Sequence, residues 1–167
     1  EHPEFRSFLK LAAERFHVNI TTHGEHIDKP LAKFLADNKV DQIHFNYQGS
    51  KWHDKIHGIE GSYAAQLNSI KYIKDTDIDF VVGITVAEYN YDDLLDIMTE
   101  ASDLDASRLR IWESVGHGGK MRGKLKPRDI WTHSTKIAKE LGYGFVQSYE
   151  PEFEGDVWIP CLAASNF

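Results

Sequence analysis

Apolar positions along the chain switch between helical and strand spacing. Residues 4–16 carry Phe5, Phe8, Leu9, Leu11, Ala12 and Phe16 on one stripe of a helix. Short apolar or β-branched runs separate such stripes, which is typical of strands. The pattern predicts helices over residues 4–16, 27–37, 62–74, 90–104 and 128–141, and strands over residues 18–22, 40–46, 78–86, 109–112 and 143–149.

Polar residues and glycines refine the ends of these elements. Asn90 is a candidate N-cap for the helix that follows it, and Gly142 is a candidate C-terminal stop. The segment 47–60 is rich in Gly, His, Asp and Lys, so it is predicted to be a loop. A second loop, rich in Gly and Lys, is predicted over residues 114–126.

The alternation of helices and strands predicts an α/β fold of repeated βα units around a parallel sheet. The run Ile78–Val86 is continuously apolar, as expected of a strand buried on both faces. Right-handed crossovers leave two architectures, a doubly wound open sheet or part of a TIM-like (β/α) barrel. We expect one domain over residues 1–150 and an acidic, aromatic tail over residues 151–167.

Composition and charge exclude several classes of protein. The 167 residues include 19 Lys and Arg against 26 Asp and Glu, a net charge of −7, which argues against nucleic acid or an anionic membrane as partner. No apolar run approaches the roughly 18 residues of a membrane helix, and no signal-peptide pattern is seen, so a cytoplasmic protein is expected. The single cysteine, Cys161, excludes an intrachain disulfide scaffold.

The predicted strands end in polar, glycine-bearing turns. In either α/β architecture, ligands bind at the carboxyl ends of the strands. These ends are Thr21–Gly24, Asn46–Gly49, Thr85–Glu88 and Glu113–Gly116. Their side chains suit a small molecule that carries hydroxyl and amine groups.

Nine histidines raise the question of a metal site. His23 and His26 flank Glu25 after a predicted strand, and with Glu113 they define one alternative function, a metal-dependent barrel hydrolase. His53 and His57 are four residues apart, the spacing of one helical face, but the flanking glycines favour an ordinary loop. A further alternative is a non-catalytic binding domain with Trp52, Trp131 or Trp158 in an exposed patch.

A colinear set of short motifs resembles a known enzyme family. Asn46-Tyr47-Gln48-Gly49 is followed by His53-Asp54, by His57-Gly58 and by Gly61-Ser62-Tyr63 at the start of a helix. Thr21-Thr22-His23-Gly24 comes before this stretch and Ile84-Thr85-Val86 comes after it. In this order the motifs resemble the middle of a radical S-adenosylmethionine (SAM) enzyme, in particular the branch with a C-terminal cysteine-rich (SPASM-type) domain.

The resemblance implies a fold, two cofactors and a set of site residues. It implies strand three onward of a partial (β/α)₆ TIM-like barrel that binds SAM and a [4Fe-4S] cluster. By the same resemblance, Thr22, Gly24, Asn46 and Gln48 lie near SAM, Thr85 lines the barrel, and Cys161 is a candidate ligand of an auxiliary cluster. Gln48 and His57 stand where the family has Asp and Arg, so two expected charges are lost.

The family's CxxxCxxC and Gly-Gly-Glu-Pro motifs are not in this sequence. We therefore expect an interior fragment of a radical SAM enzyme that is inactive by itself, with the cluster cysteines before Glu1. SAM and a peptide are the expected small-molecule ligand and substrate. An isolated part of a barrel would also expose a sheet edge, so self-association is expected.

Overall fold

The computed structural model describes residues 2–114, 124–142 and 147–148, and everything below refers to these residues. In chain order the elements are α1 (Phe5–Ala13), β1 (Asn19–Thr22), α2 (Lys29–Asp37), β2 (Gln42–Tyr47), α3 (Gly49–His57), α4 (Ser62–Lys74), β3 (Asp79–Val86), α5 (Leu94–Ser102), β4 (Arg108–Glu113), α6 (Pro127–Glu140) and β5 (Gln147–Ser148). The predicted helix over residues 62–74 is confirmed residue for residue, and the other predicted elements differ mainly at their ends.

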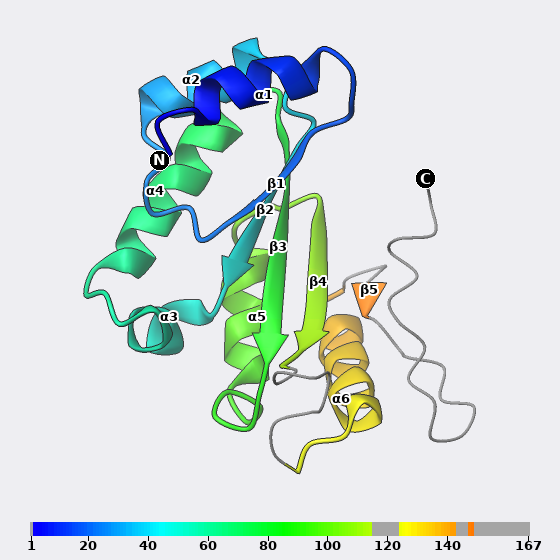
Figure 1. Ribbon diagram of the computed structural model, residues 1–167. Coiled ribbons are helices and arrows are strands. Elements are labelled where there is room, and N and C mark those ends of the chain that lie inside the picture. The colour runs from blue at the N-terminus through cyan, green and yellow to red at the C-terminus, as the bar shows by residue number, and fades with distance from the viewer. Residues whose placement is uncertain (1, 115–123, 143–146, 149–167) are drawn as a thin grey trace.

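The strands form one parallel sheet of five, in the order β1-β2-β3-β4-β5 (Figure 1). Each strand therefore pairs with the next strand in the chain. A doubly wound sheet would reverse this order at a switch point. When strands in sequential order are joined by crossovers of the same hand, the connecting helices all lie on one side of the sheet, as in a barrel wall. Of the two predicted architectures, the structure therefore has the barrel wall.

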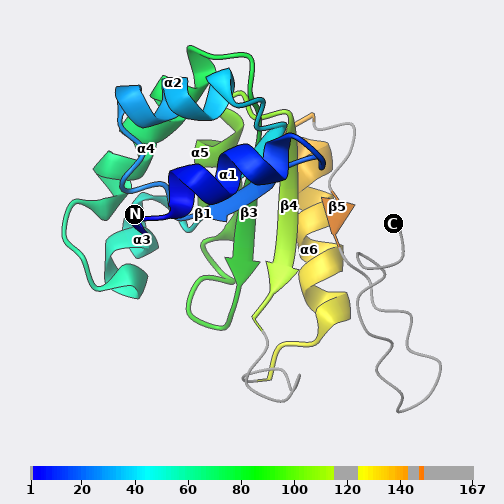
Figure 2. The same cartoon turned by 45° about the horizontal axis from the view of Figure 1, so that its top comes forward.

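The helices pack beside one another along the sheet (Figures 1 and 2). The chain of contacts runs from α2 to α4, from α4 to α3, from α3 to α5, and from α5 to α6. Helix α1 lies next to α2, where the Arg6 guanidinium stands 4.7 Å from the Phe34 ring centre. Helices α2 to α6 thus form a continuous outer layer over one face of the sheet (Figure 1).

The two faces of the sheet differ in chemistry because side chains alternate along each strand. The helix-covered face is apolar, and the residues Ile43, Phe45, Tyr47, Val82, Ile84, Val86, Leu109 and Ile111 of that face are buried in the core. The opposite face carries Thr21, His44, Asn46, Gly83, Thr85, Arg110 and Trp112, which lie in register on neighbouring strands. This polar face corresponds to the inside of a barrel wall.

Two local predictions were wrong. The segment 47–60 contains helix α3 rather than only loop. The helix ends at His57 and is capped by Gly58, whose φ of 68° is the left-handed conformation that glycine favours. Helix α5 begins at Leu94 after Asp93, so Asn90 is not its N-cap. Asn90 instead accepts from the Ala87 amide through Oδ1 at 2.8 Å, so it closes the turn that follows β3.

Other predictions fall partly or wholly outside the described residues. Of the strand predicted over 143–149, residues Gln147–Ser148 are described and pair with β4. Most of the loop predicted over 114–126 and the whole tail with Cys161 lie outside the described residues. None of the described helices is both long and apolar enough to cross a bilayer.

Candidate functional site

A chain of amide side chains joins the carboxyl ends of β2 and β3. Gln48 Nε2 donates to Asn46 Oδ1 at 3.3 Å, and Asn90 Nδ2 donates to Gln48 Oε1 at 3.2 Å. Asn90 Nδ2 also lies 3.0 Å from the carbonyl oxygen of Thr85. Gln48 and Asn90 are buried, whereas Asn46 and Thr85 are partly exposed. The hydrogen bonds fix the orientation of the Asn46 side chain and tie the Thr85 backbone to the same chain of amides.

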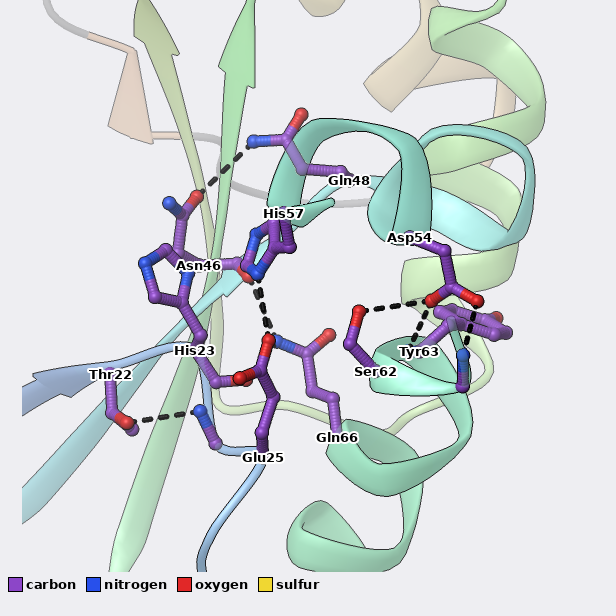
Figure 3. A network of polar contacts seen from close by, with 12 residues as sticks. Thr22, His23, Glu25, Asn46, Gln48, Asp54, His57, Ser62, Tyr63 and Gln66 are labelled. Atoms are coloured by element: carbon purple, nitrogen blue, oxygen red, sulfur yellow. Dashed lines mark hydrogen bonds and ion pairs between the residues drawn. The ribbon is translucent and has the colours of Figure 1, made fainter. Parts of the chain in front are cut away.

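The ends of β1 and β2 are tied together by a residue of α4. The buried Gln66 donates through Nε2 to the carbonyl oxygens of His23 and Asn46 at 2.7 and 2.8 Å (Figure 3). Beside it, the Gly24 amide donates to Thr22 Oγ1 at 2.9 Å. The predicted residues Thr22, Gly24, Asn46, Gln48 and Thr85 therefore lie along one connected edge of the sheet.

Gly24 is required at this edge for two reasons. Its φ of 83° is a conformation that side-chain-bearing residues rarely adopt. A β-carbon on Gly24 would also lie 2.6 Å from Cε1 of the Phe45 ring. The backbone of this turn consequently runs close over the core, and its amide faces the Thr22 hydroxyl.

A hollow lies on the polar face of the sheet below this edge. It is lined by Thr21, His44, Asn46, Gly83, Thr85 and Trp112. His44 is buried, and its burial, helped by the nearby positive charge of Arg110, lowers its pKa to about 4. The His44 ring centre lies 5.6 Å from that of Trp112. The hollow thus offers an uncharged imidazole and an exposed indole next to the amide-lined edge.

Three histidine rings and a carboxylate gather on the other side of the edge. His57 Nδ1 lies 2.9 Å from Glu25 Oε1 (Figure 3), and the His53 ring stacks on the His57 ring at 4.2 Å between centres. The His23 ring meets the His57 ring edge-on at 4.1 Å. Burial lowers the pKa of His53 to about 4 and also lowers the pKa of His23. His53 is therefore neutral at pH 7.

Asp54 of the His53-Asp54 motif connects that motif to Gly61-Ser62-Tyr63 at the start of α4. Its carboxylate accepts from the Gly61 amide at 2.7 Å, from the Ser62 hydroxyl at 2.9 Å and from the Tyr63 amide at 2.7 Å (Figure 3). These hydrogen bonds lower the pKa of Asp54. Helix α4 has no side-chain cap of its own, so Asp54 on α3 supplies the acceptor for its first turn. Asp54 therefore holds α3 against α4 and so fixes the position of His53 and His57 on α3.

The predicted alternative metal set is not the one that the fold assembles. Among the described residues, the group whose ligand atoms lie close enough for a metal is Glu25, His53 and His57. His26 is exposed, and Glu113 lies at the end of β4, where burial raises its pKa. Sequence reasoning did not assign Gln66 or His44 to the site, and it took Asn90 for a helix cap.

The sequence matches the profile of the Radical SAM superfamily over residues 2–101. The chain belongs to this superfamily, whose members use SAM and a [4Fe-4S] cluster. The resemblance in the sequence and the parallel barrel-wall fold are thereby confirmed.

Individual relatives agree with this assignment. The sporulation killing factor maturation protein SkfB of Bacillus subtilis (strain 168) is 23% identical over 128 residues, which cover 75% of this chain and 31% of SkfB. The crystal structure of Streptococcus suis SuiB bound to the precursor peptide SuiA matches with a TM-score of 0.72 at 16% identity, over 91% of this chain and 36% of SuiB. The structure of anSMEcpe with bound AdoMet and the Cp18Cys peptide matches with a TM-score of 0.65 at 16% identity, over 86% of this chain and 45% of that protein. This chain thus spans about a third of the length of SkfB and SuiB.

The two family cofactors fit this chain differently. The connected edge presents hydroxyl, amide and backbone groups, so a polar ligand such as SAM fits it. A [4Fe-4S] cluster needs several thiolates, and the only cysteine in the sequence is Cys161, outside the described residues. The described residues therefore fit SAM and contain no cluster ligands.

Proposed function

We propose that this chain forms the SAM-binding edge and the substrate-facing wall of a radical SAM enzyme that modifies a peptide. The observation that carries the proposal is the connected edge, in which Thr22, Gly24, Asn46 and Gln48 are fixed by hydrogen bonds beside the polar hollow. Membership of the superfamily supports SAM as the ligand. When bound with its cluster, SAM supplies the radical chemistry, and the protein orients the reacting groups.

The residues of the edge have separate proposed roles. Asn46 and Gln48 orient the polar groups of SAM, since the bond from Asn90 fixes the Gln48 amide. Gly24 keeps the turn after β1 packed on the Phe45 ring, which holds the backbone of the edge in place. Thr85 faces the hollow, where a neutral His44 and the exposed Trp112 offer one hydrogen-bonding and one apolar surface to substrate.

A peptide is proposed as substrate because of two relatives. SkfB is described as a maturation protein, and SuiB was crystallised with the precursor peptide SuiA. A peptide would reach the hollow along the polar face of the sheet, opposite the face against which α5 packs (Figure 1). Cys161 is proposed as a ligand of an auxiliary cluster, on the sequence resemblance alone.

The binding role is tested by equilibrium dialysis of labelled SAM against the 167-residue chain and its variants. Asn46→Ala and Gln48→Ala should each weaken SAM binding at least tenfold, because each removes a fixed hydrogen-bonding group. Asn68→Ala removes the same amide from an exposed position on α4 and should leave binding unchanged. Equal SAM affinities in all three variants would contradict the proposal.

The catalytic role is tested on the whole protein that contains this chain. After anaerobic reconstitution with iron and sulfide, electron paramagnetic resonance should detect the reduced cluster. Chromatography should then detect 5′-deoxyadenosine, and Asn46→Ala should reduce its yield. A reconstituted protein that binds SAM without cleaving it would refute the catalytic role and retain the binding role.

A further inference from the structure

Glu25, His53 and His57 form a ligand set that the radical SAM chemistry proposed above does not use. Glu25 lies in the turn after β1, and the two histidines lie one helical turn apart on α3. One oxygen of Glu25 and one ring nitrogen of each histidine all lie within 4.8 Å of one another. The fold therefore brings Glu25 to one point with two histidines that follow it by about 30 positions in the sequence.

The second observation is the state of His53. This residue is fully buried, and neither of its ring nitrogens has a hydrogen-bond partner among the described residues. A buried polar group without a partner carries a free-energy penalty, so such groups are rare in folded proteins. Burial keeps His53 neutral at pH 7, and the neutral imidazole is the form that binds a metal.

The third observation is the surroundings of the group. The side chains of His57 and Glu25 are 6% and 14% exposed, so the carboxylate is also largely withdrawn from water. A mostly buried carboxylate is stabilised by a positive partner, and His57 provides one only when it is protonated. A divalent cation would offset the Glu25 charge and satisfy one nitrogen of each histidine together.

We propose that Glu25, His53 and His57 bind one divalent transition-metal ion of the Zn²⁺ type. Two imidazoles and one carboxylate are a ligand set that zinc accepts, and three protein ligands leave a further position for solvent. Ligand atoms around a tetrahedral zinc ion lie roughly 3.3 Å apart, so binding requires a small convergence of these side chains. The site is structural in the first place, since it joins the turn after β1 to α3.

The experiment uses the untagged 167-residue chain, freed of metal with a chelator that is then removed. Zn²⁺ is titrated in competition with a chromophoric chelator, and Co²⁺ is added separately to observe its visible absorption bands. The expected result is one Zn²⁺ per chain. His53→Gln and Glu25→Gln should each weaken Zn²⁺ binding by at least tenfold and remove the Co²⁺ bands.

Two controls keep the outcome clear. His26→Gln removes an exposed histidine of the same turn and should bind Zn²⁺ like the wild type. Circular dichroism identifies a variant that fails to fold, and in that case the more exposed Glu25 variant decides. The proposal is overturned if the chain binds no Zn²⁺, or if folded Glu25→Gln and His53→Gln bind it as tightly as the wild type.

The SAM proposal and the metal proposal fail independently. Asn46→Ala should lose SAM and keep Zn²⁺, because Asn46 is not one of the three ligands. Glu25→Gln should lose Zn²⁺ whether or not SAM binds. Loss of Zn²⁺ binding in Asn46→Ala would overturn the assignment of the metal to these three residues.

Discussion

The imidazole of His44 fills the space in which a β-carbon of residue 83 would stand. A β-carbon placed on Gly83 would lie 2.1 Å from His44 Nε2, far inside the roughly 3.5 Å of a non-bonded contact. Gly83 pairs in register with Asn46 on β2, so His44, two residues earlier on the same face of β2, leans across the face of the adjacent strand. A glycine in the middle of a buried strand is thus explained by the ring that covers it.

Gly83→Ala should destabilise the chain by about 1–3 kcal/mol, because the ring must leave its position or the strands must separate. The free energy of unfolding in urea measures this effect. In a His44→Ala background the same substitution should cost much less, since the crowding atom is absent. An equal cost in both backgrounds would show that the ring does not determine the need for glycine.

Gly24→Ala should cost more stability than Gly58→Ala. Both glycines have positive φ, 83° and 68°, so alanine at either position carries the left-handed penalty of roughly 1–2 kcal/mol. Only Gly24 has a close neighbour, the Phe45 ring, whereas nothing lies within 4 Å of a β-carbon on Gly58. Urea unfolding of the two variants measures the difference, and equal costs would mean that the ring moves aside freely.

The sequence predicted the order and type of most elements because apolar spacing reports which face of each element is buried. Helix α3 was missed because its stability comes from distant residues. Lys51 and Trp52 contact the Asp93 carboxylate through Lys51 Nζ at 2.6 Å and Trp52 Nε1 at 2.7 Å. Ser50 donates through its amide to Glu100 at 2.8 Å. No local pattern reveals such contacts some 40–50 positions away, and they outweigh the weak helix propensity of the segment.

The candidate site was predicted only in part for a related reason. The rule that parallel strands present their carboxyl ends together selected the four strand ends. The family resemblance then selected Thr22, Gly24, Asn46, Gln48 and Thr85 within them. Residues that fix this edge come from elsewhere, as Gln66 does from the middle of α4. The Glu25, His53 and His57 group required α3 to be helical, so the error in that segment concealed the group.

Stability should fall as the pH decreases from about 6.5 to about 4, in part because of His44. The pKa of His44 is lowered to about 4 in the folded chain, mainly by burial and also by Arg110. Above pH 6.5 the histidine is neutral in both states and has no effect. Between the two pKa values the unfolded chain binds a proton that the folded chain does not, so the free energy of unfolding falls by about 3 kcal/mol in total.

Urea unfolding of the wild type and His44→Gln across this pH range tests the assignment. The variant should lose less stability on acidification than the wild type. His53 titrates in the same direction but is present in both proteins, so the difference isolates His44. His26→Gln, at an exposed position, is the matched control and should follow the wild type. Parallel pH profiles for wild type and His44→Gln would exclude His44 as the source.

Gln66 should matter for SAM binding even though its side chain holds protein groups. Its Nε2 donates to the carbonyl oxygens of His23 and Asn46, so it sets the distance between the ends of β1 and β2. Gln66→Met keeps the size of the side chain but removes both hydrogen bonds, which should cost about 2 kcal/mol or more. SAM affinity, measured by equilibrium dialysis, should fall as well, because Thr22 and Asn46 are no longer held in register.

The decisive comparison separates a loosened edge from general destabilisation. Ser69→Ala removes hydrogen bonds from the same helix to the carbonyl oxygens of Gly24 and Ile27, but it leaves the Asn46 carbonyl bound to Gln66. It should therefore lower stability with a smaller effect on SAM affinity than Gln66→Met. If the two variants lose SAM affinity in proportion to their loss of stability, Gln66 has no positioning role of its own at this edge.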